Sequence, residues 1–141
     1  MSRRAVAVDL GSRRIGVAVS DGAGTMAFPR PCIERGGDPV ADRRAVAGVV
    51  TEEGAAVLVV GLPVSLDGRH GAAAKAAAAE AQALAELLGE SGVAVETFDE
   101  RLTTVSAEAA LAEAGKRAGA RRGSVDSAAA TVLLQAWLDA R

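Results

Sequence analysis

The sequence has few of the residues that form disulfides, thiolate or imidazole metal sites and aromatic surfaces. It contains one cysteine, Cys32, one histidine, His70, and only 2% aromatic residues in a chain of 141. A lone cysteine excludes an internal disulfide and is typical of a reducing compartment such as the cytoplasm. Trp137 has no companion aromatic residues with which to build a platform for stacked bases. We therefore interpret Trp137 as a core residue.

Long apolar runs and an excess of positive charge are also absent. Sixteen Lys and Arg residues stand against eighteen Asp and Glu, for a net charge of −2. Whole-chain electrostatics therefore give no support for binding to a polyanion, and any such binding must come from local patches. The apolar run near the N-terminus is broken by Asp9 and Gly11, so it is too short for a signal peptide or a membrane span.

The hydrophobic pattern predicts five strands and four helices in the order β-β-β-α-β-α-β-α-α. The expected strands span residues 4–10, 15–20, 25–33, 55–61 and 93–98. Pro29 and Pro31 cannot donate to a strand ladder, so the third strand is expected at an edge of the sheet. The later strands alternate with helices and should therefore run parallel to the first.

The expected helices begin after Asp38, at Ala72, at Thr103 and at Ser124. Asp38 followed by proline indicates a helix start, and Gly54 indicates its end. These patterns predict an α/β fold: a five-stranded mixed sheet, with three antiparallel strands and then parallel strands, flanked by helices on both faces. The length predicts a single domain over residues 1–141.

Three acidic residues stand at the ends of otherwise apolar elements, namely Asp9, Glu100 and Asp126. Each has an ordinary explanation: a turn aspartate, a solvated loop acid, and an acid placed favourably at a helix start. For Asp126 that explanation is weakest. At helical spacing it shares an apolar face with Leu133 and Trp137, so its carboxylate should point toward the sheet and needs a donor or a cation.

If these three acids converge, their mutual repulsion raises the pKa of at least one of them, and a divalent ion would relieve the repulsion. Carboxylate oxygens suit Mg²⁺ or Mn²⁺, and two such ions can activate water and stabilise the leaving oxygen of a phosphodiester. The sequence therefore predicts Asp9, Glu100 and Asp126 as both catalytic and metal-binding residues.

Basic residues accompany each of the predicted acids. Four of them lie in a glycine-flanked stretch, residues 115–123, directly before Asp126. Charge runs are usually solvated surface, but a cluster beside every candidate acid is what binding to a phosphate backbone requires. We therefore expect nucleic-acid contacts from Arg13, Arg14, Arg101, Lys116, Arg117, Arg121 and Arg122.

Four motifs in this order and spacing resemble the YqgF/RuvX family over essentially the whole chain: DLGSRRIGVAVSD, VVGLPVSLDG, DERLTT and VDSAAATVLLQAWLD. The resemblance implies an RNase H-like fold. It implies a nuclease for Holliday-junction resolution or for processing the 5′ end of the 16S ribosomal RNA precursor. It places the family's acids on Asp9, Glu100 and Asp126, with Thr103, Thr104 and Ser65 near the site. Ser65 stands where family members often have Asn.

Two other functions remain open from the sequence. The segment DLGSRRIG resembles the first phosphate loop of actin-like ATPases, although those proteins close two such domains around the nucleotide. A nucleic-acid-binding or ribosome-assembly factor could keep the fold without cleaving. Nothing in these residues distinguishes branched DNA from precursor ribosomal RNA, or a monomer from a homodimer.

Overall fold

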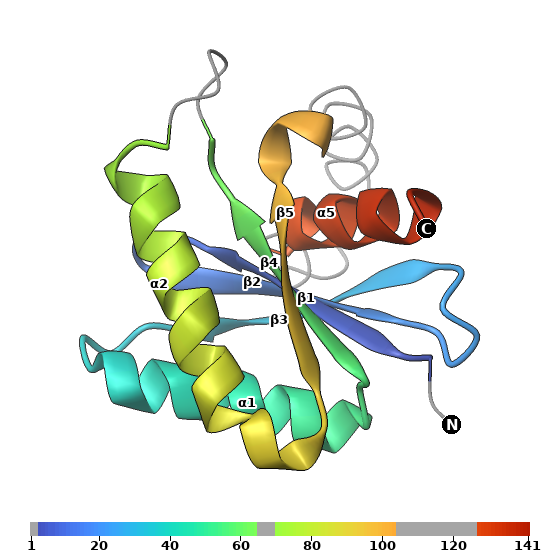
Figure 1. The fold of residues 1–141 in the computed structure, drawn as a ribbon, viewed down its shortest axis with the longest axis horizontal. Coiled ribbons are helices and arrows are strands. Elements are labelled where there is room, and N and C mark those ends of the chain that lie inside the picture. The colour runs from blue at the N-terminus through green and yellow to red at the C-terminus, as the bar shows by residue number, and fades with distance from the viewer. Residues whose placement is uncertain (1–2, 65–69, 104–126) are drawn as a thin grey trace.

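The fold is built on a central five-stranded sheet with the strand order β3-β2-β1-β4-β5 (Figure 1). The structure is a computed structural model that describes residues 3–64, 70–103 and 127–141. β1 pairs antiparallel with β2, and β2 pairs antiparallel with β3, whereas β4 lies between β1 and β5 and is parallel to both. The mixed sheet predicted from the sequence is therefore confirmed. Its strands are β1 (Ala5–Leu10), β2 (Arg14–Ser20), β3 (Ala27–Glu34), β4 (Val57–Leu62) and β5 (Ala94–Asp99).

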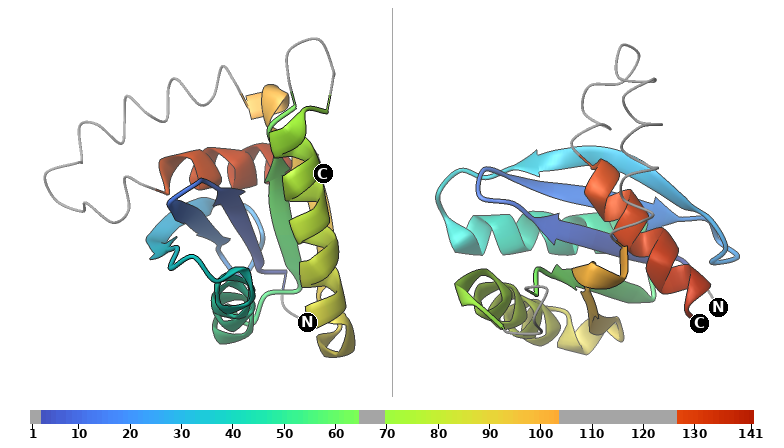
Figure 2. Two further views of the ribbon diagram at one scale, coloured as in Figure 1. Left: turned by 90° about the vertical axis from the view of Figure 1, so that its left-hand side faces the viewer. Right: turned by 90° about the horizontal axis from the view of Figure 1, so that it is seen from above.

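Among the described residues, three helices of eight or more residues cover the two faces of the sheet (Figure 2). α1 (Pro39–Glu53) and α2 (Ala72–Leu87) lie on one face, and α5 (Ala128–Asp139) lies on the other. Short 3₁₀ turns follow α2 and β5, at Gly89–Ser91 (η1) and Glu100–Thr103 (η2). Helices on both faces were predicted, and the structure confirms them.

The central strands are apolar throughout because both of their faces are buried. Successive side chains of β1 alternate between the two faces. Val6 and Val8 join the core beneath α1 and α2, while Ala5 and Ala7 join the core beneath α5. Trp137 of α5 is 5% exposed and belongs to this second core, as predicted. Alanines on the sheet let α5 lie close to it.

The ends of α1 agree with the sequence prediction. The Asp38 side chain accepts a hydrogen bond from the Val40 amide at 3.0 Å, and Pro39 occupies the first turn. Gly54 ends the helix in the left-handed region, with φ of 64°, where glycine is favoured. β3 lies at an edge of the sheet, as its two prolines predicted.

The chain turns directly after β5, ahead of the helix expected from Thr103. η2 begins at Glu100 and ends at Thr103, so the first residue of the expected helix is the last residue of a 3₁₀ turn. The remainder of that helix, residues 104–114, lies outside the described residues, as does Ser124. The described part of the last helix, α5, begins at Ala128.

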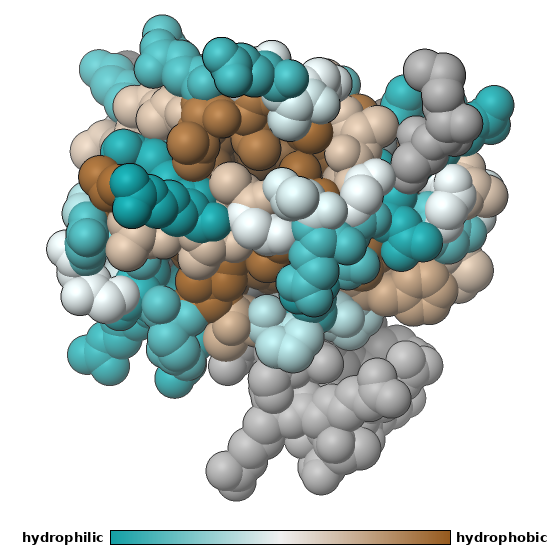
Figure 3. Space-filling view, turned by 90° about the horizontal axis from the view of Figure 1, so that it is seen from below, coloured by the Kyte–Doolittle hydropathy of each residue, from teal (hydrophilic) through white to brown (hydrophobic). Residues whose placement is uncertain are grey.

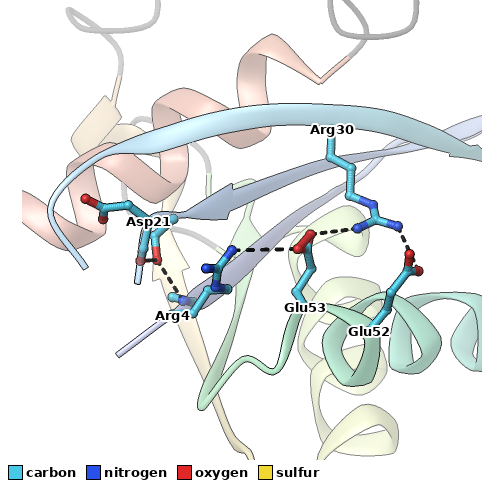
Figure 4. Close-up of polar contacts among 7 residues, drawn as sticks. Arg4, Asp21, Arg30, Glu52 and Glu53 are labelled. Carbon is cyan, nitrogen blue, oxygen red and sulfur yellow. Dashed lines mark hydrogen bonds and ion pairs between the residues drawn. The ribbon is translucent and has the colours of Figure 1, made fainter. Parts of the chain in front are cut away.

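An ion-pair network joins α1 to the antiparallel half of the sheet (Figure 4). Arg30 of β3 donates to Glu53 at 2.7 Å and to Glu52 at 3.0 Å, both in the last turn of α1. Arg4, just before β1, lies 3.8 Å from Glu53. Because these groups are partly exposed, the network contributes little free energy, but it orients the end of α1.

On the face seen from the α1 side, apolar and hydrophilic groups of the described residues lie interspersed (Figure 3). The exposed large hydrophobic residues among those described come from four different elements or loops: Met26, Phe28, Val40 and Leu87. Isolated exposure of this kind is normal in soluble domains. Within the described ranges, no helix has the length and apolarity needed to cross a membrane.

Hydrogen bonds of Ser127 join the start of α5 to the sheet. Its hydroxyl oxygen accepts a hydrogen bond from the Val17 amide of β2 at 3.0 Å and donates to the Arg30 carbonyl of β3 at 2.5 Å. The β2–β3 register is irregular between Ile15 and Val17, which leaves backbone groups without their usual ladder partners. The fully buried hydroxyl satisfies two of these groups at once.

We predict that Ser127→Ala lowers the free energy of unfolding by about 1–3 kcal/mol, because it leaves a buried amide and a buried carbonyl without a partner. Urea unfolding followed by circular dichroism measures this change. The matched control is Ser91→Ala on exposed η1, which removes one local hydrogen bond to the Leu88 carbonyl at 2.6 Å and should therefore cost less, about 0.5–1 kcal/mol. Equal effects of the two substitutions would show that the Ser127 contacts do not stabilise the fold.

Candidate active site

Two of the predicted acids meet at one edge of the sheet. Asp9 lies near the end of β1, and Glu100 directly follows β5. β4 separates these strands and runs parallel to both, so all three strands present their carboxyl ends at the same edge. A hydrogen bond joins the Glu100 carboxyl group to Asp9. The chain therefore brings together two acids that are about ninety residues apart in the sequence.

Gly61 of β4 makes this contact possible. Neighbouring strands lie about 4.8 Å apart, so Glu100 must reach across a whole strand to approach Asp9. A Cβ atom on Gly61 would lie 2.5 Å from Glu100 Oε1 and 3.2 Å from Glu100 Cγ. It would also lie 3.0 Å from Leu133 Cδ2 of α5. Any side chain at this position would occupy the space that the Glu100 side chain takes.

The shared site strongly alters the acidity of Glu100. Partial burial, the hydrogen bond to Asp9, and the negative charges of Asp9 and Asp99 together raise the pKa of Glu100 to about 8. At neutral pH the Glu100 carboxyl group is therefore protonated and donates its proton to Asp9. A cation between the two groups would favour the ionised form and displace that proton.

Asp9 and Glu100 open onto a pocket of about 580 Å³. The turn between β1 and β2 forms one side of it, with Gly11 and Ser12. The facing surfaces of α1 and α2 form the other side. This volume lies within the range of small-molecule sites, roughly 300–1,000 Å³. The two acids are thus accessible from an open cavity rather than enclosed in the core.

A group of charged side chains lines the same pocket on the helix side. Arg43 of α1 donates two hydrogen bonds to Glu80 of α2, at 2.9 and 2.7 Å. These bonds hold the pKa of Glu80 below its ordinary value. Arg35, which follows β3, has its Nε atom 3.9 Å from Asp42 Oδ2. The pocket therefore contains two guanidinium groups in addition to the acids, and hydrogen bonds fix that of Arg43.

Three of the basic residues predicted beside the acids are described, and all three lie on the surface. Arg14 forms an ion pair with Glu34 at 2.9 Å, and Arg101 forms hydrogen bonds to Asp99 at 2.5–3.1 Å. Arg13 is exposed in the turn after β1. These three arginines flank the acids in the chain, as expected, but two of them already have carboxylate partners. Thr103 ends η2.

Several predicted site residues lie outside the described residues: Asp126, Ser65, Thr104, Lys116, Arg117, Arg121 and Arg122. The helix face on which Asp126 was predicted can be followed from Ala130 onward. Ala130 and Leu133 are at most 2% exposed and pack on the sheet. The apolar character inferred for that face is therefore correct.

The described part of the site offers two carboxyl groups to a cation. Among the described residues, no group of three or more His, Cys, Asp or Glu side chains is placed to hold a metal ion. Asp9 and Glu100 nevertheless supply oxygen ligands of the type that hard divalent cations take, with no competing nitrogen or sulfur donor in the pair. Their shared proton marks the place where a positive charge would be favourable.

Sequence reasoning missed four residues of the site. Gly61 appears in the sequence only as part of the motif VVGLPVSLDG, and its steric role depends on a strand pairing that no local pattern shows. Arg43 and Glu80 are 37 residues apart and meet only in the fold. Arg35 lies in a glycine-rich stretch and belongs to none of the four motifs that resemble the family.

The raised pKa of Glu100 predicts how the stability of the metal-free protein depends on pH. Between about pH 4.5 and pH 8 the unfolded chain releases the Glu100 proton while the folded chain keeps it. The folded state is therefore stabilised at low pH and loses this contribution as pH rises through about 8. Glu100→Gln should flatten this decline.

Thermal unfolding of chelator-treated protein at intervals across this pH range measures the effect. Glu90→Gln, on exposed η1, is the matched control and should keep the wild-type slope. Identical slopes for wild type and Glu100→Gln would contradict the shared proton.

Comparison with known proteins places the chain in a family. Residues 3–140 match the family described as "RuvX: Holliday junction resolvase". A relative from Leifsonia xyli subsp. xyli (strain CTCB07) is 48% identical over 133 residues, covering 94% of this chain and 83% of the relative. A relative from Anaeromyxobacter sp. (strain Fw109-5) is 44% identical over 138 residues, covering 98% of each. Both are named "Putative pre-16S rRNA nuclease".

Solved structures with this arrangement are distant in sequence. The Thermus thermophilus RuvC in complex with a Holliday junction substrate has a TM-score of 0.64 at 14% identity, covering 97% of this chain and 95% of that one. The yeast mitochondrial Holliday junction resolvase Ydc2 has a TM-score of 0.58 at 10% identity, covering 97% and 78%. These likenesses confirm the RNase H-like fold. With the family match and the identities above, they show that this chain belongs to the RuvX family.

Proposed function

We propose that this protein is a metal-dependent endonuclease of the RuvX type that hydrolyses phosphodiester bonds in structured nucleic acid. The observation that carries the proposal is the pair of carboxyl groups, Asp9 and Glu100, that share a proton across Gly61 beside an open pocket. A single RNase H-like domain over residues 1–141 would contain the whole site. The lone cysteine supports a cytoplasmic location for it.

Asp9 and Glu100 would hold a divalent cation, Mg²⁺ or Mn²⁺, together with Asp126 just before α5. When bound, such a cation polarises the phosphate and lowers the pKa of a bound water. Asp9 and Glu100 bind and orient, and Glu100 holds a proton at its carboxyl oxygen until a positive charge replaces it. Gly61 keeps the space between the two acids clear. Ser127 holds the start of α5 against the sheet.

Two substrates are consistent with the site. Relatives named for pre-16S ribosomal RNA favour the 5′ end of that precursor, and the likeness to RuvC with a Holliday junction favours branched DNA. A precursor RNA end needs one active site and suits a monomer, whereas symmetric cleavage of a junction needs two sites and therefore a homodimer. Phosphate contacts would come from Arg13, Arg14 and Arg101, and from Lys116, Arg117, Arg121 and Arg122.

We predict that Asp9→Asn, Glu100→Gln and Asp126→Asn each lower the cleavage rate by roughly 10²–10⁴-fold, the range for groups that position charge and protons in a transition state. The measurement is single-turnover cleavage of a four-way DNA junction and of a pre-16S RNA 5′ leader, with Mg²⁺ or Mn²⁺. Glu90→Gln is the charge-matched control and should cleave like wild type.

The same experiment separates the other functions that the sequence left open. Salt-sensitive binding by wild type without cleavage of either substrate would contradict the nuclease proposal and favour a non-cleaving assembly factor. Thermal stabilisation by ATP, without nucleic-acid binding, would favour the actin-like nucleotide-binding function.

A second prediction concerns the stretch before Asp126. Replacing both Arg121 and Arg122 by alanine should weaken binding to every substrate and reduce the slope of log affinity against log salt by about 2, because each lost phosphate contact releases about one fewer counterion. Fluorescence anisotropy over a salt series measures this slope. Replacing exposed Arg44 and Lys75 by alanine removes the same charge and should leave the slope unchanged.

A further inference from the structure

The pocket beside Asp9 and Glu100 extends beyond what hydrolysis of a phosphodiester needs. A cation and one phosphate would engage only the two acids and the adjacent β1–β2 turn. The same cavity continues between α1 and α2 to Arg35, Asp42, Arg43 and Glu80. This part of the pocket, which we call the helix-side compartment, contains both a distinct apolar surface and its own charged groups.

The apolar surface of the helix-side compartment comes mainly from one face of α2. Ala73, Ala76 and Ala77 follow at helical spacing, and Leu84 continues the face deeper into the core. Ala73 and Ala76 are exposed, and Ala77 is buried. A row of methyl groups without larger side chains leaves room for a flat ring to lie against the helix. Apolar walls with a few placed polar groups are typical of small-molecule sites.

The polar groups of the compartment suit a nucleotide. The two hydrogen bonds to Glu80 fix the guanidinium of Arg43, and the lowered pKa of Glu80 keeps its carboxylate charged. A fixed guanidinium and a fixed carboxylate offer donors and acceptors to the edge of a base. Because the two groups already neutralise each other, they favour a polar ring over a bare anion.

Arg35 supplies the observation that points most directly to a ligand. Its Nε atom is buried, and none of the described residues accepts a hydrogen bond from it. Asp42 is too distant at 3.9 Å, although it balances the charge. The Arg35 main chain is held in place, since its amide donates to the Arg13 carbonyl at 2.9 Å. The Arg35 side chain is 28% exposed and lines the pocket, so its guanidinium can meet a phosphate oxygen there, and a charge-assisted bond of this kind would offset the cost of the unsatisfied donor.

We propose that the helix-side compartment is a nucleotide subsite. It receives one unpaired nucleotide of the strand next to the bond cleaved at Asp9 and Glu100, with its base against the alanine face of α2 and its phosphate on Arg35. The inference rests on the proposed nuclease function and adds to it a preference for substrates with an unpaired nucleotide next to the cleaved bond. A base inside a duplex would have to leave its stack to enter, and this costs least where the strand is already unpaired. The enzyme therefore favours cleavage beside single-stranded nucleotides.

The test is equilibrium binding, with Ca²⁺ in place of Mg²⁺ so that cleavage does not interfere. The probes are fluorescent hairpins with and without a single-stranded extension of about 12 nucleotides, in RNA and in DNA forms. Wild type should bind the extended hairpin about tenfold more tightly than the blunt one. Ala76→Trp, which fills the compartment, and Arg35→Ala should each lose this preference while still binding the blunt hairpin.

Matched controls lie on the same helices outside the pocket lining. Ala78→Trp adds the same ring to an exposed position of α2, and Arg44→Ala removes the same charge from an exposed position of α1. Both should keep the wild-type preference. If Ala76→Trp fails to fold by circular dichroism, Arg35→Ala and its control still decide the test. A preference for the extended hairpin in the RNA form alone, or in the DNA form alone, would support the subsite and show which nucleic acid supplies the nucleotide.

An abasic residue in the extension probes the base contact itself. It should weaken binding by wild type and have no further effect on Ala76→Trp, because the two changes remove the same interaction. Equal binding of extended and blunt hairpins by wild type would overturn the proposal, and so would a preference retained in both Ala76→Trp and Arg35→Ala. Absence of cleavage in Mg²⁺ with this preference intact would contradict the nuclease function while leaving the subsite supported.

Discussion

The contact between Glu100 and Asp9 across the bare backbone of Gly61 is the constraint on which the rest of the site depends. A parallel sheet places strand ends at one edge but keeps alternate strands roughly 10 Å apart, which is too far for two short acids to meet directly. The missing side chain at Gly61 lets Glu100 lie over the middle strand. Leu133 of α5 borders the same space, so the helix, the sheet and the acid pair pack together there.

Small residues also allow close packing in the rest of the core. With only 2% aromatic residues, the core is built from alanine, valine and leucine, and tight contact replaces large buried area. Ala5 and Ala7 of β1 meet Ala130 of α5, so the helix lies close to the strand that carries Asp9. The Ser127 hydroxyl then fixes the position of that helix along the sheet. Close packing on this face therefore also sets where α5 begins relative to the strand that carries Asp9.

The sequence predicted those features that depend on local chemistry or on strand order. Asp38 and Gly54 bound a helix, Pro29 marks an edge strand, and parallel strands bring Asp9 and the residue after β5 to one edge. It could not predict features that exist only through side-chain contacts between distant elements. The steric role of Gly61, the Arg43–Glu80 pair and the unsatisfied Arg35 donor all require the packed structure. Similarly, no local pattern predicted η2, the turn that begins immediately after β5 at Glu100.

An acidic protein that acts on a polyanion must limit repulsion at its own active site. At neutral pH the proton on Glu100 removes one negative charge beside Asp9, while Arg43 balances Glu80 within the same pocket. The metal-free site therefore repels a phosphate less than it would if all of its acids were ionised and unpaired. A cation bound between Asp9 and Glu100 would displace the proton, so its affinity would rise with pH up to about 8. The negative charge needed to hold such a cation would thus form mainly when the cation is present to neutralise it.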